Sequence, residues 1–176
     1  MIATEPVDVI FLQETLWTAE AISHLLESML PIWIFLGLDA NGRSGGIALG
    51  YNSRAINLHN SWGGSGHIGV NLFIVDLVME IRSYNVYGSC HHRPEYWDHF
   101  LSSKLLQKEN LIMGGDLNFS IGHSESWGHQ AQRDPLFDYF ENALESHNLI
   151  NIPSAKQQPT WRNNMMQEHQ DLFLHL

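Results

Sequence analysis

The sequence predicts a layered α/β sandwich built of mixed β-sheets and helices. Short apolar runs with the length of buried strands alternate with helical patterns along most of the chain. Between residues 46 and 87, however, several strands follow one another without a helix, which a purely doubly wound topology would not produce. No internal repeat or low-complexity linker interrupts the sequence, so we assign residues 1–176 to one domain.

The strands are predicted from compact apolar or β-branched runs. In chain order they span residues 7–12, 32–36, 46–51, 68–77, 79–87 and 111–113. A turn over residues 39–42 is expected to close the second strand. Gly63, Gly64 and Gly66 are expected to interrupt the pattern between the third strand and the fourth.

Three helices complete the predicted order. Apolar residues recur at three- and four-residue steps over residues 18–29, and Pro31 follows as a stop. Pro94 suits the first turn of a helix that runs to about Lys108, whose apolar stripe is expected to face the core. Pro135 opens the third helix, whose inner side is formed by Leu136, Phe137, Tyr139, Phe140, Ala143 and Leu144.

Composition and charge exclude several classes of protein. The chain has 176 residues, 44% of them hydrophobic, and a net charge of −10, which rules out a basic nucleic-acid-coating protein and a cationic membrane peptide. The longest apolar stretch, residues 29–38, is too short to span a bilayer. Cys90 is the only cysteine and cannot form an internal disulfide. We expect a soluble intracellular protein; a nuclear location is compatible, although no signal is identified.

Two acidic residues follow predicted strands and mark a candidate site. Glu14 comes two residues after the first strand and Asp116 three residues after the last. In layered α/β folds the ligand crevice lies at the carboxyl ends of strands. Gly114 and Gly115 would let the backbone approach a phosphate, and Asn118, two residues beyond Asp116, would share its face in an extended chain. A carboxylate and a carboxamide on one face suit a hard cation, or a water that must lose a proton.

A purely structural interpretation stays open at this point. Acids after strands commonly cap helices, and Gly-Gly-Asp often marks only a turn. The run Cys90-His91-His92 does not predict zinc, because neighbouring residues of a strand point to opposite faces and no second cysteine is present. Trp127 and Trp161 would suit base stacking or anchoring of a loop equally well.

Five short motifs occur in an order that resembles a known family. They are Leu12-Gln13-Glu14-Thr15, Ser44-Gly45-Gly46-Ile47-Ala48, Asn85-Val86-Tyr87-Gly88, Gly114-Gly115-Asp116-Leu117-Asn118 and Pro159-Thr160-Trp161. Together they resemble the endonuclease/exonuclease/phosphatase superfamily, and most of all the endonuclease-like domain of plant non-LTR retrotransposons. The resemblance covers nearly the whole chain.

The resemblance implies a four-layer α/β sandwich of mixed β-sheets flanked by helices, which hydrolyses phosphate esters with Mg²⁺ or Mn²⁺. By motif, Glu14 is similar to the family's metal-binding glutamate. Asp116 resembles the aspartate that activates the attacking water, and Asn118 the asparagine that positions the phosphate. Tyr87 matches the tyrosine near the scissile phosphate. Asp171 falls where the family has the aspartate that orients a catalytic histidine.

The chain also departs from the family pattern. Ser89-Cys90 stand where Pro-Asn is usual. No strand ending in an asparagine precedes Val7, and no Ser-Asp-His segment follows Asp171. We therefore expect an incomplete fold, truncated at both ends, and a retroelement-derived fragment with impaired activity.

Two hypotheses follow. The first is a divalent-metal-dependent phosphodiester hydrolase of endonuclease type that acts on nucleic acid, with DNA as the first expectation; the sequence leaves RNA, phosphoinositide and nucleotide substrates open. The second is a catalytically inactive fragment that at most binds nucleic acid or a protein. Neither requires a membrane or a defined protein partner. Because the chain is acidic, nucleic-acid binding is expected to be weak and salt-sensitive unless the cation is present.

Overall fold

A computed structural model describes most of the chain, and the described residues belong to two compact units. The description covers residues 7–41, 44–103, 106, 110–120, 126–127, 134–152, 161–162 and 171–172. The first unit is Met1–Tyr87 with Lys108–Gly115, and the second is Gly88–Gln107 with Asp116–Leu176.

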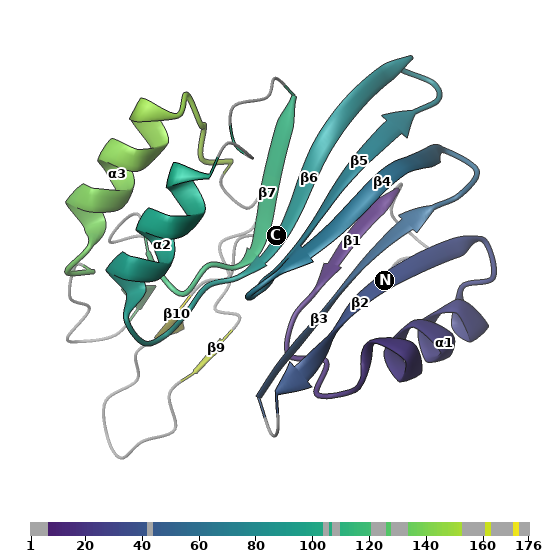
Figure 1. The fold of residues 1–176 in the computed structure, drawn as a ribbon, viewed down its shortest axis with the longest axis horizontal. Helices are drawn as coiled ribbons and strands as arrows, with labels where there is room; N and C mark the ends of the chain where they lie inside the picture. The colour runs from purple at the N-terminus through teal and green to yellow at the C-terminus, as the bar shows by residue number, and fades with distance from the viewer. Residues whose placement is uncertain are drawn as a thin grey trace. The chain divides into compact units, whose positions relative to one another are not determined.

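The first unit contains two sheets (Figure 1). One has three strands in the order β1-β3-β2, and the other has four in the order β4-β5-β6-β7. The strands are β1 Val9–Leu12, β2 Trp33–Asn41, β3 Ser44–Asn52, β4 Ile56–Gly64, β5 His67–Ile74, β6 Met79–Tyr87 and β7 Leu111–Asp116.

The second of these sheets is mixed, as the sequence predicts. The β4–β5 and β5–β6 pairs are antiparallel. Along β6 and β7, the Arg82 N–H donates to the Asn110 carbonyl and the Gly88 N–H donates to the Asp116 carbonyl. Residue numbers rise together on the two strands, so this pair is parallel. A parallel pair needs a long crossover connection, and the one here contains a helix, Arg93–Ser102.

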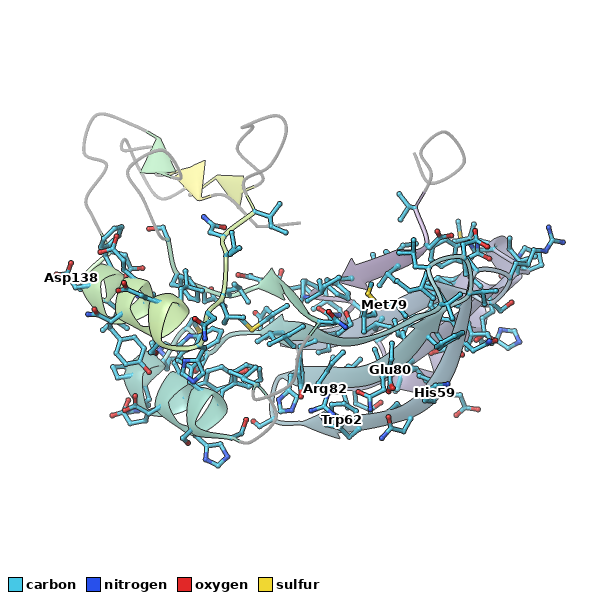
Figure 2. All side chains as sticks on the ribbon, turned by 90° about the horizontal axis from the view of Figure 1, so that it is seen from above. His59, Trp62, Met79, Glu80, Arg82 and Asp138 are labelled. Atoms are coloured by element: carbon cyan, nitrogen blue, oxygen red, sulfur yellow. The ribbon has the colours of Figure 1, made fainter. Side chains whose placement is uncertain are left out.

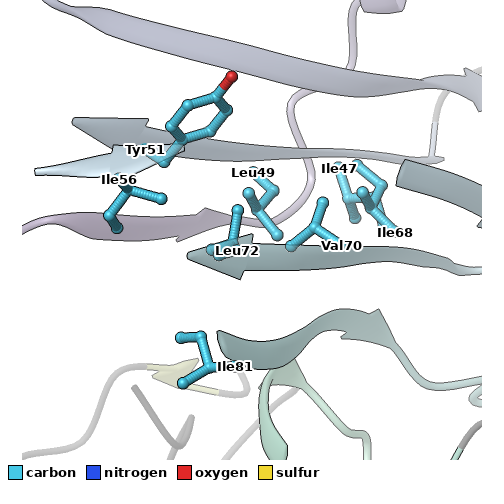
Figure 3. Close-up of a cluster of buried hydrophobic side chains, with 8 residues drawn as sticks. All are labelled: Ile47, Leu49, Tyr51, Ile56, Ile68, Val70, Leu72 and Ile81. Carbon is cyan, nitrogen blue, oxygen red and sulfur yellow. The ribbon is translucent and has the colours of Figure 1, made fainter. Parts of the chain in front are cut away.

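The core of the first unit lies between its two sheets (Figure 3). Alternate residues of β5, Ile68, Val70 and Leu72, face inward and are at most 3% exposed. They pack against Leu49 and its neighbours on β3, so strand alternation places one apolar face of each sheet against the other. The buried cluster is Ile47, Leu49, Tyr51, Ile56, Ile68, Val70, Leu72 and Ile81.

Helix α1, Ala19–Met29, packs on the outer face of the β1-β3-β2 sheet, beside β2 (Figure 1). A Cβ added at Gly37 of β2 would lie 2.8 Å from Ala19 Cα, so the bare glycine permits the close approach. Thr18 Oγ1 accepts from the Ala21 N–H, and Asp39 Oδ1 accepts from the Ala19 N–H at 2.7 Å. The helix start is therefore capped both locally and from β2.

The face of the β4-β5-β6-β7 sheet opposite to the core carries polar and aromatic side chains. Figure 2 shows Trp62 and Arg82 together, with the Arg82 guanidinium carbon 5.2 Å from the Trp62 ring centroid. Further along the same strands, His59 Nδ1 lies 3.6 Å from a Glu80 carboxylate oxygen (Figure 2). Apolar residues on one face and polar residues on the other are typical of a strand with period-two patterning.

The second unit is built around an aromatic cluster. Its helices are α2 Arg93–Ser102 and α3 Phe137–Ser146, and a small sheet of order β8-β10-β9 is formed by Ser126–Trp127, Asp171–Leu172 and Trp161–Arg162. Trp97 is 1% exposed and meets Phe100, Phe119 and Phe140 at ring-centroid distances of 5.6, 5.2 and 5.5 Å. The predicted apolar stripe of the helix after Pro94 is thus confirmed as core at Trp97 and Phe100.

Four strand predictions were wrong. No strand was predicted between residues 51 and 68, but β4 runs from Ile56 to Gly64 and includes two of the glycines that were expected to interrupt the pattern. Residues 39–41, expected to lie in a turn, belong to β2 instead, which pairs with β3 as far as Asn41. Strand β7 runs through both glycines to Asp116 rather than ending at Met113. In these three cases pairing with a neighbouring strand overrides a locally poor strand sequence. In the fourth case, the strand expected over residues 68–77 is shorter, because β5 ends at Ile74 and residues 75–78 form a turn.

One helix boundary was also wrong. The helix after Pro94 ends at Ser102, six residues before the predicted end at Lys108. The Ser102 and Ser103 hydroxyls donate to the His99 and Phe100 carbonyls, so side chains satisfy acceptors that a further turn would have used.

The predicted α/β fold with two sheets and associated helices is confirmed. Within the described ranges, no helix combines the length and apolar character needed to cross a membrane.

Candidate active site

Glu14 lies at the apex of a loop that is held by the backbone of β3. The Thr15 N–H donates to the Gly46 carbonyl at 3.0 Å, and the Leu16 N–H donates to the Gly45 carbonyl at 3.2 Å. Glu14 itself is exposed and has a φ of 49°, in the left-handed region that a residue with a side chain rarely adopts. An unfavourable conformation of this kind persists only where the surrounding contacts determine it.

Gly46 is required for this loop to sit against β3. Its φ is 77°, and a Cβ added there would lie 2.5 Å from Thr15 Oγ1 and 3.2 Å from the Leu16 nitrogen. Any side chain at this position would push the Glu14 loop away from the strand. The Ser-Gly-Gly motif therefore has a steric role in placing Glu14.

The structure brings Tyr87 and Glu14 together. The Tyr87 hydroxyl, at the end of β6, donates to Glu14 Oε1 at 3.0 Å. These residues are 73 positions apart, so the contact depends on the packing of β6 beside the β1 end of the other sheet. Two of the predicted site residues thus form one cluster in the first unit.

A buried amide lies beneath this cluster. Asn85 on β6 is 0% exposed, and its Nδ2 donates to the Ala48 carbonyl at 2.8 Å and to the Leu12 carbonyl at 3.3 Å. Its Oδ1 accepts a hydrogen bond from Gln13 Nε2. Asn85 therefore ties the last residue of β1 and the first residue of the Glu14 loop to β3 and β6.

Gly115 closes the same network from β7. Its φ is 121°, and an added Cβ would lie 2.5 Å from Gln13 Nε2, 2.9 Å from Asn85 Oδ1 and closer still to the Val86 carbonyl oxygen. The Gly-Gly-Asp motif thus has a packing role in the first unit at Gly115.

Asp116 and Asn118 form a turn in the second unit. The Asn118 N–H donates to Asp116 Oδ1 at 3.1 Å, as in an Asx-turn. Asn118 Nδ2 donates to the Gly88 carbonyl at 2.6 Å, while the Gly88 N–H donates to the Asp116 carbonyl at 2.7 Å. Both predicted residues are half-buried and are fixed to one another.

The predicted reason for pairing Asp116 with Asn118 was wrong. They were expected to project to one face of an extended chain, but β7 ends at Asp116 and Asn118 has a φ of 53°. Asparagine tolerates this left-handed conformation better than most residues. The two side chains are therefore brought together by a turn rather than by strand alternation.

The structure describes less of the remaining candidate residues, Asp171, Trp127, Trp161, His91 and His92. Asp171 lies in β10, opposite Trp127 and Arg162, and its side chain lies outside the described part of the structure. The side chains of Trp127 and Trp161 are likewise not described. His91 and His92 are exposed.

The oxygens offered by these residues fit a hard divalent cation. In the first unit Glu14 supplies a carboxylate, and in the second Asp116 supplies a carboxylate and Asn118 an amide oxygen; each is a donor that Mg²⁺ takes in proteins. Among the described residues, no three side chains of His, Cys, Asp or Glu converge. That finding is compatible with Mg²⁺, which usually keeps several waters and takes one or two protein carboxylates.

Sequence reasoning missed the roles of Asn85 and Gln13, although both lie in quoted motifs. A signal for Asn85 was present. Counting by twos along β6 from Ile81 places Ser83 and Asn85 on the core-facing side of the strand. A carboxamide at such a position must find partners inside the protein.

Comparisons with known proteins agree with this architecture. The model of the Endonuclease/Exonuclease/phosphatase family matches residues 1–168. No curated protein matches the chain. A similar solved structure is the endonuclease domain of TRAS1, a telomere-specific non-LTR retrotransposon, with a TM-score of 0.67 and 15% identity over 96% of this chain and 71% of that one.

Two further solved structures are similar at lower coverage. The 2',3'-cyclic phosphatase ANGEL2 has a TM-score of 0.54 and 14% identity, over 77% of this chain and 43% of that one. TDP2 of D. rerio, complexed with a single-strand DNA product, has a TM-score of 0.50 and 13% identity, over 68% of this chain and 51% of that one. These likenesses show the fold, and the family match covers nearly the full length. The chain belongs to the endonuclease/exonuclease/phosphatase family.

Proposed function

We propose that this domain is a divalent-metal-dependent phosphodiester hydrolase of endonuclease type. The observation that carries the proposal is the Glu14 loop, in which an exposed carboxylate is held in a left-handed conformation and contacted by the Tyr87 hydroxyl. Strained backbone at a polar cluster is a recurring property of functional sites. The Asp116–Asn118 turn adds a second carboxylate with a defined neighbour.

Each residue has a chemical task in this proposal. Glu14 holds Mg²⁺ or Mn²⁺, and Tyr87 orients the Glu14 carboxylate through its hydroxyl. Asp116 accepts the proton of the attacking water, since its carboxylate is half-buried and fixed by the turn. Asn118 uses one amide hydrogen on Gly88 and has a second for a phosphate oxygen. By its motif alone, Asp171 would take the place of the family's histidine-orienting aspartate. When bound, the cation would neutralise charge on the non-bridging phosphate oxygens.

DNA is the proposed substrate, in the setting of a retroelement endonuclease. The likeness to a retrotransposon endonuclease domain and to a protein bound to a DNA product supports this choice. The net charge of −10 would oppose a polyanion, so DNA binding should be weak and should depend on the cation.

The direct test is nicking of supercoiled DNA with and without Mg²⁺. Asp116→Asn keeps the shape of the side chain but removes the base, and nicking should fall by about 10²–10⁴-fold. Asp138→Asn is the matched control, because Asp138 is an exposed carboxylate in the first turn of α3 (Figure 2). Its nicking rate should match that of the wild type.

Equal background nicking in the wild type and in Asp116→Asn would contradict the hydrolase proposal. A filter-binding measurement on the same DNA would then decide whether the chain is the alternative, an inactive domain that binds nucleic acid without cutting it.

A further inference from the structure

We propose that Asn85 is a positioning residue that sets the place of the Glu14 carboxylate from below. The inference rests on the proposed function in one respect, namely that Glu14 holds the cation. Asn85 does not contact Glu14. It acts through Leu12 and Gln13, the two residues that precede Glu14 in the chain.

The side chain of Asn85 is fully buried and its hydrogen-bonding groups are satisfied within the protein. It is 0% exposed, and both of its amide hydrogens and its carbonyl oxygen have partners. The partners belong to β1, β3 and the Glu14 loop, whereas Asn85 itself belongs to the other sheet. The contacts span 37 to 73 positions of the sequence, so they form only when the two sheets pack.

The Gln13 side chain is held through its amide nitrogen, which contacts Asn85, and not through its amide oxygen. Gln13 Nε2 donates to Asn85, but Gln13 Oε1 is buried and has no partner among the described residues. On the other side of Glu14, Thr15 Oγ1 is also buried and without a partner in the described part. A buried oxygen without a partner disfavours its own position, so other contacts must keep both residues in place.

Those contacts enclose Glu14 on both sides. Asn85 holds residues 12 and 13, and the Gly45 and Gly46 carbonyls hold residues 15 and 16 through backbone hydrogen bonds. Glu14 lies between the two anchors at a φ of 49°. Removing one anchor leaves its left-handed conformation unsupported, and the carboxylate should then sample other positions.

The test uses Asn85→Asp, which keeps the shape of the side chain. It replaces the Nδ2 donor by an oxygen that cannot donate to the Leu12 and Ala48 carbonyls. Two readouts are measured on the full chain. The first is hydrogen exchange of the Thr15 and Leu16 amides, measured without metal. The protection factors of these two amides should fall at least tenfold. The second is Mg²⁺ affinity by calorimetric titration, which should fall about 10–100-fold, as for other residues that orient a ligand.

Leu72→Ala is the control for a purely structural role. Leu72 is 0% exposed in the same sandwich, so this change lowers stability without touching the Glu14 loop. At a temperature where it remains folded, Mg²⁺ affinity and the exchange of Thr15 and Leu16 relative to other amides should match the wild type. If Asn85→Asp does not fold, Gln13→Met replaces it, because this variant removes the Gln13–Asn85 contact while Asn85 keeps its two carbonyl partners.

Each outcome decides the inference. Loss of both amide protection and Mg²⁺ affinity supports it. Unchanged protection of Thr15 and Leu16 overturns it, whatever the metal does, and so does lost protection with unchanged affinity. A wild type that binds no Mg²⁺ overturns the metal role of Glu14 and with it this inference, and the exchange data then still report whether Asn85 orders the loop.

Discussion

The two units hold their candidate catalytic carboxylates in different ways. Glu14 is placed by long-range contacts, since Asn85 and Tyr87 reach its loop from more than 70 positions away. Asp116 is placed mainly by a local turn, in which the partner is two residues along the chain, with one longer connection to Gly88. The first arrangement depends on the packing of two sheets, while the second forms over a few residues.

The cores of the units differ in the same sense. The first unit packs aliphatic side chains between two sheets, so its interior is assembled from strands distant in sequence. The second packs rings around Trp97, including Phe119 and Phe140 at 3.6 Å between centroids. The comparison teaches that the Glu14 loop should be sensitive to changes in the residues that connect it to the other sheet, such as Asn85, and the Asp116 turn to changes in its own residues.

The largest effect is expected at Gly115. Gly115→Ala forces a side chain onto a φ of 121° and against Gln13, Asn85 and the Val86 backbone. Strain and overpacking together should cost about 2–6 kcal/mol in the free energy of unfolding. Urea denaturation measures this value, and protection of the Thr15 and Leu16 amides should fall with it.

The neighbouring glycine provides the control. Among the described residues, a Cβ at Gly114 would meet only the Phe11 ring, at 2.9 Å, and a ring can shift where a backbone cannot. Gly114→Ala should therefore cost less than about 1.5 kcal/mol. If both substitutions cost the same, the packing beneath the Glu14 loop is not the tight element described above.

An intermediate effect is expected at Asn118. Asn118→Gly removes the amide contact with Gly88 but suits the φ of 53°, so it should cost about 1 kcal/mol. Asn118→Ala loses the same contact and adds left-handed strain, for a total of about 2–3 kcal/mol. Equal stabilities of the two variants in thermal denaturation would show that the turn is not held in the left-handed conformation.

The smallest effect is a pH dependence that Tyr96 adds to the stability of the second unit. Burial raises the pKa of Tyr96, in the aromatic unit, to about 12. The unfolded chain loses this proton near pH 10, so the contribution is fully present below pH 10 and is lost as the pH rises toward 12. Tyr96→Phe should therefore reduce the loss of stability over this range, measured by urea denaturation at pH 9 to 11.

Tyr96→Phe should cost little at pH 7, because the Tyr96 hydroxyl is buried without a partner among the described residues. Tyr139 is the contrasting case. Burial and the hydrogen bond to Asp98 at 2.7 Å raise the pKa of Tyr139, so Tyr139→Phe removes a used hydroxyl and should cost about 0.5–1.5 kcal/mol at neutral pH. The same alkaline profile in wild type and Tyr96→Phe would contradict the role given to Tyr96.

Much of the fold was predictable because, over most of the chain, the local hydrophobic pattern favours the same element that tertiary packing stabilises. The span 79–87 was predicted with both ends correct, and it forms a strand in which residues 83–86 are all buried. Strand β4 was missed because Asn57, Asn60 and the glycines at its end are poor strand formers. Only pairing with β5 makes that segment a strand, and pairing partners are not visible in a local window.

The candidate site was predictable to a smaller extent. Motif order identified Glu14, Tyr87, Asp116 and Asn118 as candidates, and the structure places them in two pairs. The left-handed backbone at Glu14 and the amide network of Asn85 could not be derived in the same way. Both result from contacts between strands whose separation in sequence exceeds any local pattern.

The sequence by itself determined the order of most long elements, the family and the candidate residues, because periodicity and short motifs are properties of neighbouring positions. The tertiary structure alone decided that β7 extends to Asp116, that Asn118 turns back on it, and that Asn85 reaches across to the Glu14 loop. Hydrogen bonds between distant segments form only when the two sheets bury their apolar faces together, so their geometry is a consequence of packing.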